Sequence, residues 1–193
     1  MHPFSALARL LVLVVAGIIS MRSLAQATSV TEVSFPDLVQ RAEIIVVGSV
    51  SEIKEQWDEA RKMPLTLVTF SNLTVLKGNP GASMTLEFLG GRTPQGLLLT
   101  IPGVPQFKVG EKTVVFGAGN HRDFCPLVGV WQGLLRVMTD PQRQIETVSD
   151  NFRIPIVKIH AGKFVKLSPA TSEQAPLSLP ALLQAIQQEL PNS

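Results

Sequence analysis

The feature that most constrains the fold is a stretch of alternating side chains, LTLVTFSNLTVLKG, at Leu65–Gly78. One face carries Leu65, Leu67, Thr69, Ser71, Leu73 and Val75, and the other carries Thr66, Val68, Phe70, Asn72, Thr74 and Leu76. Successive side chains of a β-strand point to opposite faces of its sheet. Because both faces hold apolar residues, the stretch predicts a long strand that is half-buried on both sides, as in a curved sheet.

Other segments also have strand character and are separated by turns rich in glycine and proline. They are Ile44–Ile53, Met84–Gly91, Leu97–Ile101, Lys112–Gly119, Pro126–Met138, Ile154–Ile159 and Lys163–Leu167. Gly48 interrupts the first of them and predicts a bulge or a sharp bend. We interpret the polar piece Lys54–Pro64 as a protruding loop, and Thr139–Gln144 as a hairpin-like turn.

Two segments predict helices. In Ser34–Glu43, Ser34 can cap the first turn, and apolar residues recur at helical spacing. Near the C-terminus, Ser178 can cap a helix whose apolar stripe is Leu182, Leu183, Ile186 and Leu190. We therefore expect a mainly β fold, a small OB-like antiparallel barrel with a short N-terminal helix and a C-terminal helix.

The N-terminal segment is typical of a signal peptide. Arg9 precedes an apolar run of about ten residues, which is too short to cross a bilayer that needs roughly 20. Cleavage is expected between Ala27 and Thr28. The expected organisation is a signal peptide at 1–27, a β-barrel domain at 28–168, and a linker with the C-terminal helix at 169–193. The protein is then periplasmic or extracellular, with no membrane span after signal cleavage.

Charge and cysteine content narrow the function. Removing Arg9 and Arg22 from the 17 basic residues leaves 15, equal to the 15 acidic residues. A formal balance near zero gives no electrostatic footprint for nucleic acid or for an anionic membrane. A single cysteine excludes an internal disulfide framework, so burial and sheet hydrogen bonds must hold the fold together.

Cys125 and His121 form the only cysteine–histidine neighbourhood in the sequence. A thiolate activated by imidazole, or half of a metal site, is one interpretation. Zinc normally needs three or four protein ligands, and no spacing supplies the others. We favour Cys125 as a small apolar residue at the start of a strand that begins at Pro126, with an intermolecular disulfide as a minor alternative. No catalytic residue, metal ligand or cofactor is assigned.

The candidate contact surface consists of Lys54–Pro64 and the glycine-rich segment Gly90–Pro105, which contains Arg92. Both are long connections that a barrel does not need for closure, and loops on a rigid scaffold commonly carry recognition. Trp57 is an aromatic residue in a charged loop, so it either folds back over the barrel or is offered to a partner. Trp57 and Arg92 are the candidate binding residues.

Several short motifs together resemble netrin-like domains and the tissue inhibitors of metalloproteinases. They are Ala42-Glu43, Gly48-Ser49-Val50, Lys77-Gly78 and the turn Phe107–Glu111. The fuller pattern also includes Gly90-Gly91, Pro102–Pro105 and Val130–Gly133. This fuller pattern resembles uncharacterised secreted bacterial proteins. The resemblance implies an OB-like barrel. The inhibitors bind the protease zinc through an N-terminal cysteine, which this chain lacks, so no inhibitory residue is carried over.

These observations lead to three hypotheses. The first is an exported, non-enzymatic binding or interaction module with a protein partner. The second, which rests on the resemblance, is a protease inhibitor or protease-associated protein. The third is an enzyme that depends on Cys125 and His121.

Overall fold

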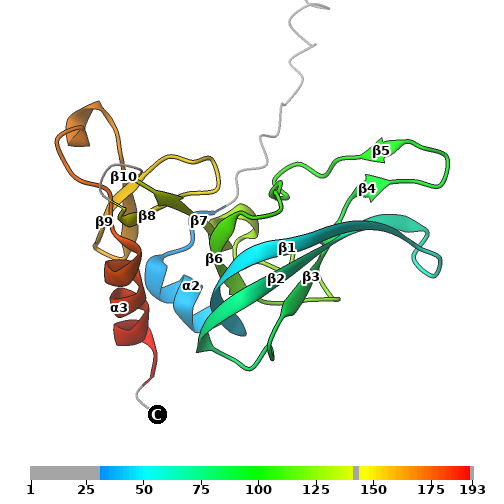
Figure 1. The fold of residues 1–193 in the computed structure, drawn as a ribbon, viewed down its shortest axis with the longest axis horizontal. Coiled ribbons are helices and arrows are strands. Elements are labelled where there is room, and N and C mark those ends of the chain that lie inside the picture. The colour runs from blue at the N-terminus through cyan, green and yellow to red at the C-terminus, as the bar shows by residue number, and fades with distance from the viewer. Residues whose placement is uncertain (1–30, 141–143, 192–193) are drawn as a thin grey trace, which may run out of the picture. The chain divides into compact units, whose positions relative to one another are not determined.

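The computed structural model describes residues 31–140 and 144–191. They form a mainly β structure, and its principal sheet has six strands in the order β3-β2-β1-β6-β7-β8 (Figure 1). Every neighbouring pair in this sheet is antiparallel. The outermost strands are β3 and β8, and no ladder within the described ranges joins them. The expected cleavage site at Ala27 and Thr28 lies outside the described residues.

The strands of the principal sheet are β1 (Ile44–Asp58), β2 (Met63–Lys77), β3 (Met84–Leu89), β6 (Lys112–Gly117), β7 (Leu134–Thr139) and β8 (Glu146–Ser149). Two small ribbons complete the strands: β4 (Gly91–Arg92) with β5 (Leu98–Leu99), and β9 (Ile156–His160) with β10 (Lys163–Lys166). Short 3₁₀ turns lie at Val130–Gly133 (η1) and Pro169–Thr171 (η2).

Both predicted helices are confirmed, because their start signals act locally. Helix α2 spans Phe35–Arg41, and the Ser34 hydroxyl accepts a hydrogen bond of 3.2 Å from the Asp37 N–H. Helix α3 spans Leu179–Glu189 and follows Ser178, which accepts one from the Ala181 N–H. Such caps satisfy backbone donors that the first helical turn leaves free. None of the described helices is both long and apolar enough to cross a membrane.

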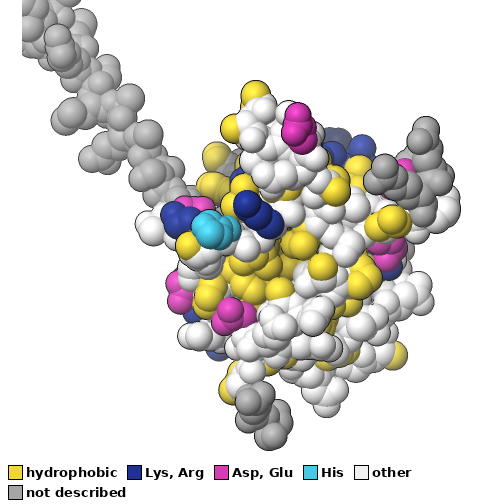
Figure 2. All heavy atoms as spheres, turned by 90° about the vertical axis from the view of Figure 1, so that its left-hand side faces the viewer, with side chains coloured by type: hydrophobic (Ala, Val, Ile, Leu, Met, Phe, Trp, Pro, Cys, Tyr) yellow, Lys and Arg dark blue, Asp and Glu magenta, His cyan; other side chains and the backbone are white. Residues whose placement is uncertain are grey.

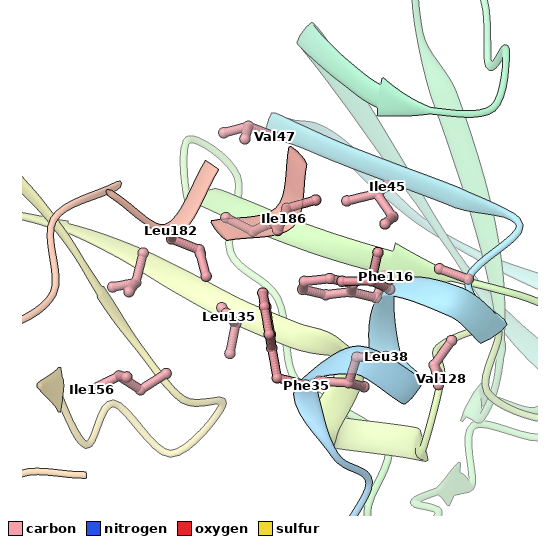
Figure 3. Close-up of a cluster of buried hydrophobic side chains, with 14 of the residues drawn as sticks. Phe35, Leu38, Ile45, Val47, Phe116, Val128, Leu135, Ile156, Leu182 and Ile186 are labelled. Carbon is pink, nitrogen blue, oxygen red and sulfur yellow. The ribbon is translucent and has the colours of Figure 1, made fainter. Parts of the chain in front are cut away.

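The two helices bury their apolar stripes on one face of the sheet (Figure 3). Phe35 and Leu38 from α2, and Leu182 and Ile186 from α3, converge there on Phe116 of β6. All five side chains are at most 2% exposed. This helix-covered layer accounts for one of the two apolar faces of the sheet.

A second apolar cluster lies on the opposite face of the strands. Phe70 of β2 and Phe88 of β3 pack there against Phe107, with ring centroids 5.8 and 5.0 Å apart respectively. In β2, Leu73 packs against this second cluster and Leu76 against the helix-covered one. The sheet is therefore apolar on both sides, as the alternation at Leu65–Gly78 predicted. The predicted faces hold only as far as Ser71, however. Asn72 has a φ of 54° where β2 gains one residue relative to β1, so Leu73 lies on the side of Phe70 and Leu76 on the opposite side.

The bulge expected at Gly48 is confirmed. Val47 pairs with Thr74 and Ser49 with Ser71, so Gly48 alone lies opposite Asn72 and Leu73. A Cβ atom on Gly48 would lie 2.6 Å from Leu73 Cδ2, so a larger residue there would have to displace the end of that side chain.

Two sequence interpretations were wrong. Lys54–Pro64 is not a loop: β1 and β2 stay paired out to Asp58 and Met63, and only the four residues 59–62 turn the chain. Pro126–Met138 is not one strand. Gly129 and Val130 have φ values of 63° and 61°, which interrupt extended backbone, and strand β7 begins only at Leu134.

Other predictions held with adjusted bounds. The hairpin around Ala161-Gly162 is confirmed as β9 and β10, and β3 and β6 lie where the sequence placed strands. The strand expected at Leu97–Ile101 is shorter, since only Leu98 and Leu99 are paired. Strands β7 and β8 form a hairpin, but residues 141–143 of its predicted turn lie outside the described residues.

Candidate functional site

A glycine pair brings the two halves of the predicted contact surface together. Gly90 and Gly91 have φ values of 120° and 129°, a region that glycine enters at little cost. The chain thereby turns out of β3, and β4 lies against β1 and β2. The Gly90 N–H donates to the Pro64 carbonyl at 2.9 Å, and the Thr66 hydroxyl donates to the Gly90 carbonyl at 2.9 Å.

A groove of about 180 Å³ lies between this ribbon and the hairpin. Ile53, Phe88 and Phe107 contribute apolar surface, and Glu55 and Thr66 contribute polar groups. Leu98–Ile101 and Val104–Gln106 line the remainder. The groove can therefore hold a largely apolar side chain that has a polar group close by.

Arg92 links the ribbon to the hairpin. Its Nε atom lies 3.7 Å from Glu55 Oε2, and the Arg92 side chain is 63% exposed. A contact this long and this accessible contributes little to stability. Arg92 is therefore better placed to meet another molecule than to hold the fold.

Trp57 lies on the same face of β1 as the groove. The pairing of β1 with β2 is regular from Ile53 to Asp58. Every second side chain of a strand points to the same face, so Ile53, Glu55 and Trp57 share one face. Trp57 is half-buried and pairs with Pro64. The structure thus places both candidate binding residues around Glu55, a residue of the segment that the sequence alone indicates as a protruding polar loop.

The ribbon also exposes apolar side chains. Leu97, Leu98 and Leu99 are 69%, 61% and 38% exposed. No charged residue occurs between Arg92 and Lys108. Three adjacent accessible leucines beside a groove are typical of an interaction site, whereas scattered single ones need no explanation.

Cys125 and His121 do not form a nucleophile–base pair. Cys125 is 4% exposed within the second apolar cluster, and burial raises the pKa of its thiol to about 12. The His121 ring nitrogens instead lie 3.3 Å from Glu87 Oε2 and 3.3 Å from Asn120 Nδ2. Pro126 does not begin a strand, as Leu127 makes only an isolated bridge to Gly117.

A second polar cluster, which sequence reasoning missed, lies around Glu87. Arg61 Nη1 donates to Glu87 Oε1 at 2.6 Å, which raises the pKa of the guanidinium, and Arg61 Nη2 donates to the His121 carbonyl at 3.0 Å. These residues line a groove of about 290 Å³ with Met63 and Phe124. Its polar groups bond mainly to one another, so the cluster joins the hairpin to the loop before Cys125.

A buried ion pair is the other polar feature that was missed. Arg136 Nη1 lies 2.5 Å from Glu111 Oε1, and these side chains are 5% and 9% exposed. Arg153 adds a second contact to the same oxygen at 2.8 Å. Arg136 also donates to the carbonyls of Asn151 and Gln106. An arginine inside the apolar run LLRVM was the available sequence signal, because buried charges are normally paired.

In the part of the chain that the structure describes, no cluster of metal ligands marks a site. Within residues 31–140 and 144–191, no group of three or more His, Cys, Asp or Glu side chains could hold a metal ion. Figure 2 shows the end that carries α3, β9 and β10, where charges of both signs lie among apolar side chains. Neither sign dominates that face.

Comparison with known proteins identifies no relative: no family model, curated protein or solved structure matches the chain. The resemblance to netrin-like domains therefore stays a prediction.

Proposed function

We propose that the protein is an exported, non-enzymatic binding module that holds a protein partner. Its contact surface comprises the far half of the β1–β2 hairpin (Ile53–Thr66) and the segment Gly90–Pro105, which we call the hairpin–ribbon surface. The single observation that supports this most is the exposure of Leu97–Leu99 beside a groove, on a ribbon that is separate from the six-stranded sheet. Export is supported by the signal-like N-terminus, and N-terminal sequencing of the exported protein should begin at Thr28.

The scaffold of this module is proposed to be an OB-like barrel. Three register shifts between β1 and β2 support this idea, because bulges bend strands toward closure. An experimental structure in which the sheet remains flat and open would remove the barrel and leave the contact surface unaffected.

Site-specific photo-crosslinking tests the function. A photoreactive amino acid placed at Trp57 or at Leu98 should form adducts with one exported protein of the source cells. The same residue at Gln184, an exposed position on α3, is the matched control. Adducts from the first two positions alone support the proposal. Adducts from all three positions, or from none, contradict it.

The second candidate is a protease inhibitor or protease-associated protein, and it rests on the motif resemblance. The chain from Thr28 onward would be assayed against secreted metalloproteases. If the progress curves of these proteases do not change at any concentration of this chain, the second candidate is removed and the proposed binding module is unaffected.

A further inference from the structure

The principal sheet protects both of its outer strands. On β3, the Asn120 side chain imitates a neighbouring strand: its Oδ1 accepts from the Glu87 N–H at 3.0 Å, and its Nδ2 donates to the Thr85 carbonyl at 2.9 Å. On the other side, the Val148 N–H of β8 donates to the Leu177 carbonyl at 3.0 Å. Such coverage keeps unpaired backbone groups away from other chains.

Strand β5 has no such cover. The Thr93 N–H donates to the Leu97 carbonyl at 2.8 Å, and Gly91 pairs with Leu99. Because backbone groups alternate in direction along an antiparallel strand, those of Leu98 and Thr100 face away from β4. Neither of these two N–H groups has a hydrogen-bond partner among the described residues. Figure 1 shows β5 as the outer strand of its ribbon.

The usual chemical protection of an edge is also missing. Exposed edge strands normally carry lysine or other charges that discourage pairing. The six residues from Gly96 to Ile101 are GLLLTI and carry no charge. Pro94 and Pro102 flank them and cannot donate to a ladder, so they limit the open edge to this length.

We propose that β5 binds an extended, uncharged and apolar segment of a partner protein as an additional strand. The partner's backbone would pair with the outward groups of Leu98 and Thr100, and one of its side chains would enter the groove beside Phe88. A cavity of about 150 Å³ is large enough for a benzene ring. The groove of about 180 Å³ therefore accommodates one leucine or phenylalanine side chain. This inference rests on the proposed binding function and specifies its mode.

A second copy of this chain is a poorer occupant. Pairing β5 with its own copy would join six edge residues per chain, whereas a stable interface uses about 20–30 residues a side. It would also leave the groove unfilled, since the leucines of β5 already form part of its wall. A partner segment satisfies both the edge and the groove.

The test begins by selecting heptapeptides from a random library displayed on phage, with the chain from Thr28 onward as the target. Selected peptides should have apolar residues at alternate positions and lack internal proline. Amide hydrogen exchange would then be measured by NMR. In the free protein, Leu98 and Thr100 should exchange quickly, and the bound peptide should slow both at least tenfold.

Backbone-modified peptides provide the second measurement. N-methylation of one peptide residue whose N–H pairs with β5 should weaken binding by about tenfold, as expected for one lost main-chain hydrogen bond. Methylation at the intervening positions should have little effect. On the protein, Leu98→Pro should abolish binding, whereas Thr100→Val, which keeps its N–H, should not.

Every outcome bears on the proposal. Failure to select a peptide, or slowed exchange elsewhere than β5, overturns strand addition. Slowed exchange that depends on protein concentration without peptide identifies a second copy as the occupant. In each case, crosslinks from Leu98 and Trp57 to a partner would still support the hairpin–ribbon surface. Loss of those crosslinks would instead overturn the binding function itself.

Discussion

Cys125 shows how burial determines what one residue can do. Its thiol lies in the second apolar cluster, and burial raises its pKa from 9.0 to about 12. The thiolate is the reactive form of cysteine, so Cys125 should resist iodoacetamide in the folded protein and react after unfolding in guanidinium. Rapid alkylation of the folded protein would contradict this placement.

The same shift predicts a pH dependence of stability. The folded thiol holds its proton up to about pH 12, whereas the unfolded one loses it near pH 9. The contribution of the protonated Cys125 thiol to the free energy of unfolding is therefore complete below pH 9, and it is lost as the pH rises from 9 to 12. Chemical unfolding over this range should show a smaller loss for Cys125→Ala than for the wild type. Equal losses of stability in the variant and in the wild type would contradict the raised pKa of Cys125.

Gly133 is a residue whose size is fixed by backbone contact. A Cβ atom there would lie 2.8 Å from the Phe116 carbonyl oxygen and 2.7 Å from that of Val128. Gly133→Ala should therefore lower the free energy of unfolding by about 1–3 kcal/mol. Gly117→Ala is the matched control, because its added Cβ meets nothing nearer than 3.6 Å. Equal losses for the two variants would contradict the packing argument.

At the scale of elements, the buried ion pair joins β7 to the turn before β6. Glu111→Leu leaves the Arg136 charge buried without its partner and should cost about 3–5 kcal/mol of stability. Arg136→Met should cost less, because Arg153 still contacts Glu111. The double variant Glu111→Leu/Arg136→Met should cost much less than the sum of the single changes. Chemical unfolding of the three variants measures this coupling, and additive losses would show that the pair is not coupled.

Elements with local signals were predicted well. The helix caps at Ser34 and Ser178, and the alternation in β3 and in β2 up to Ser71, are determined by neighbouring residues. The projecting hairpin was missed because solvent meets both of its faces, so no apolar alternation marks Lys54–Asp58. The break at Gly129 was missed because a positive φ leaves no periodicity in an otherwise apolar run.

The candidate site was only partly predictable. The sequence indicated Trp57 and Arg92 by residue type and by the length of their connections. The position of Arg92 beside Glu55, on the face that also carries Trp57, depends on the bend at Gly90-Gly91. That bend is a property of the folded chain. The open edge of β5 depends on register, which local sequence patterns do not specify.

For the whole molecule, we propose a division between a stable body and a recognition surface. The body consists of two apolar clusters on opposite faces of one sheet. The hairpin–ribbon surface extends from it and holds its leucines in solvent. Substitutions on that surface should therefore affect binding far more than folding.

The most direct test measures the affinity of the crosslinked partner for the double variant Trp57→Ala/Leu98→Ser by titration calorimetry, together with the variant's Tm. The account predicts affinity at least tenfold weaker, with Tm lowered by less than about 4 °C, the shift expected for 1 kcal/mol in a chain of this size. Leu86→Ser, at a side chain only 1% exposed, should lower Tm well beyond that. Unchanged affinity, or a collapse of Tm in the double variant, would contradict the account.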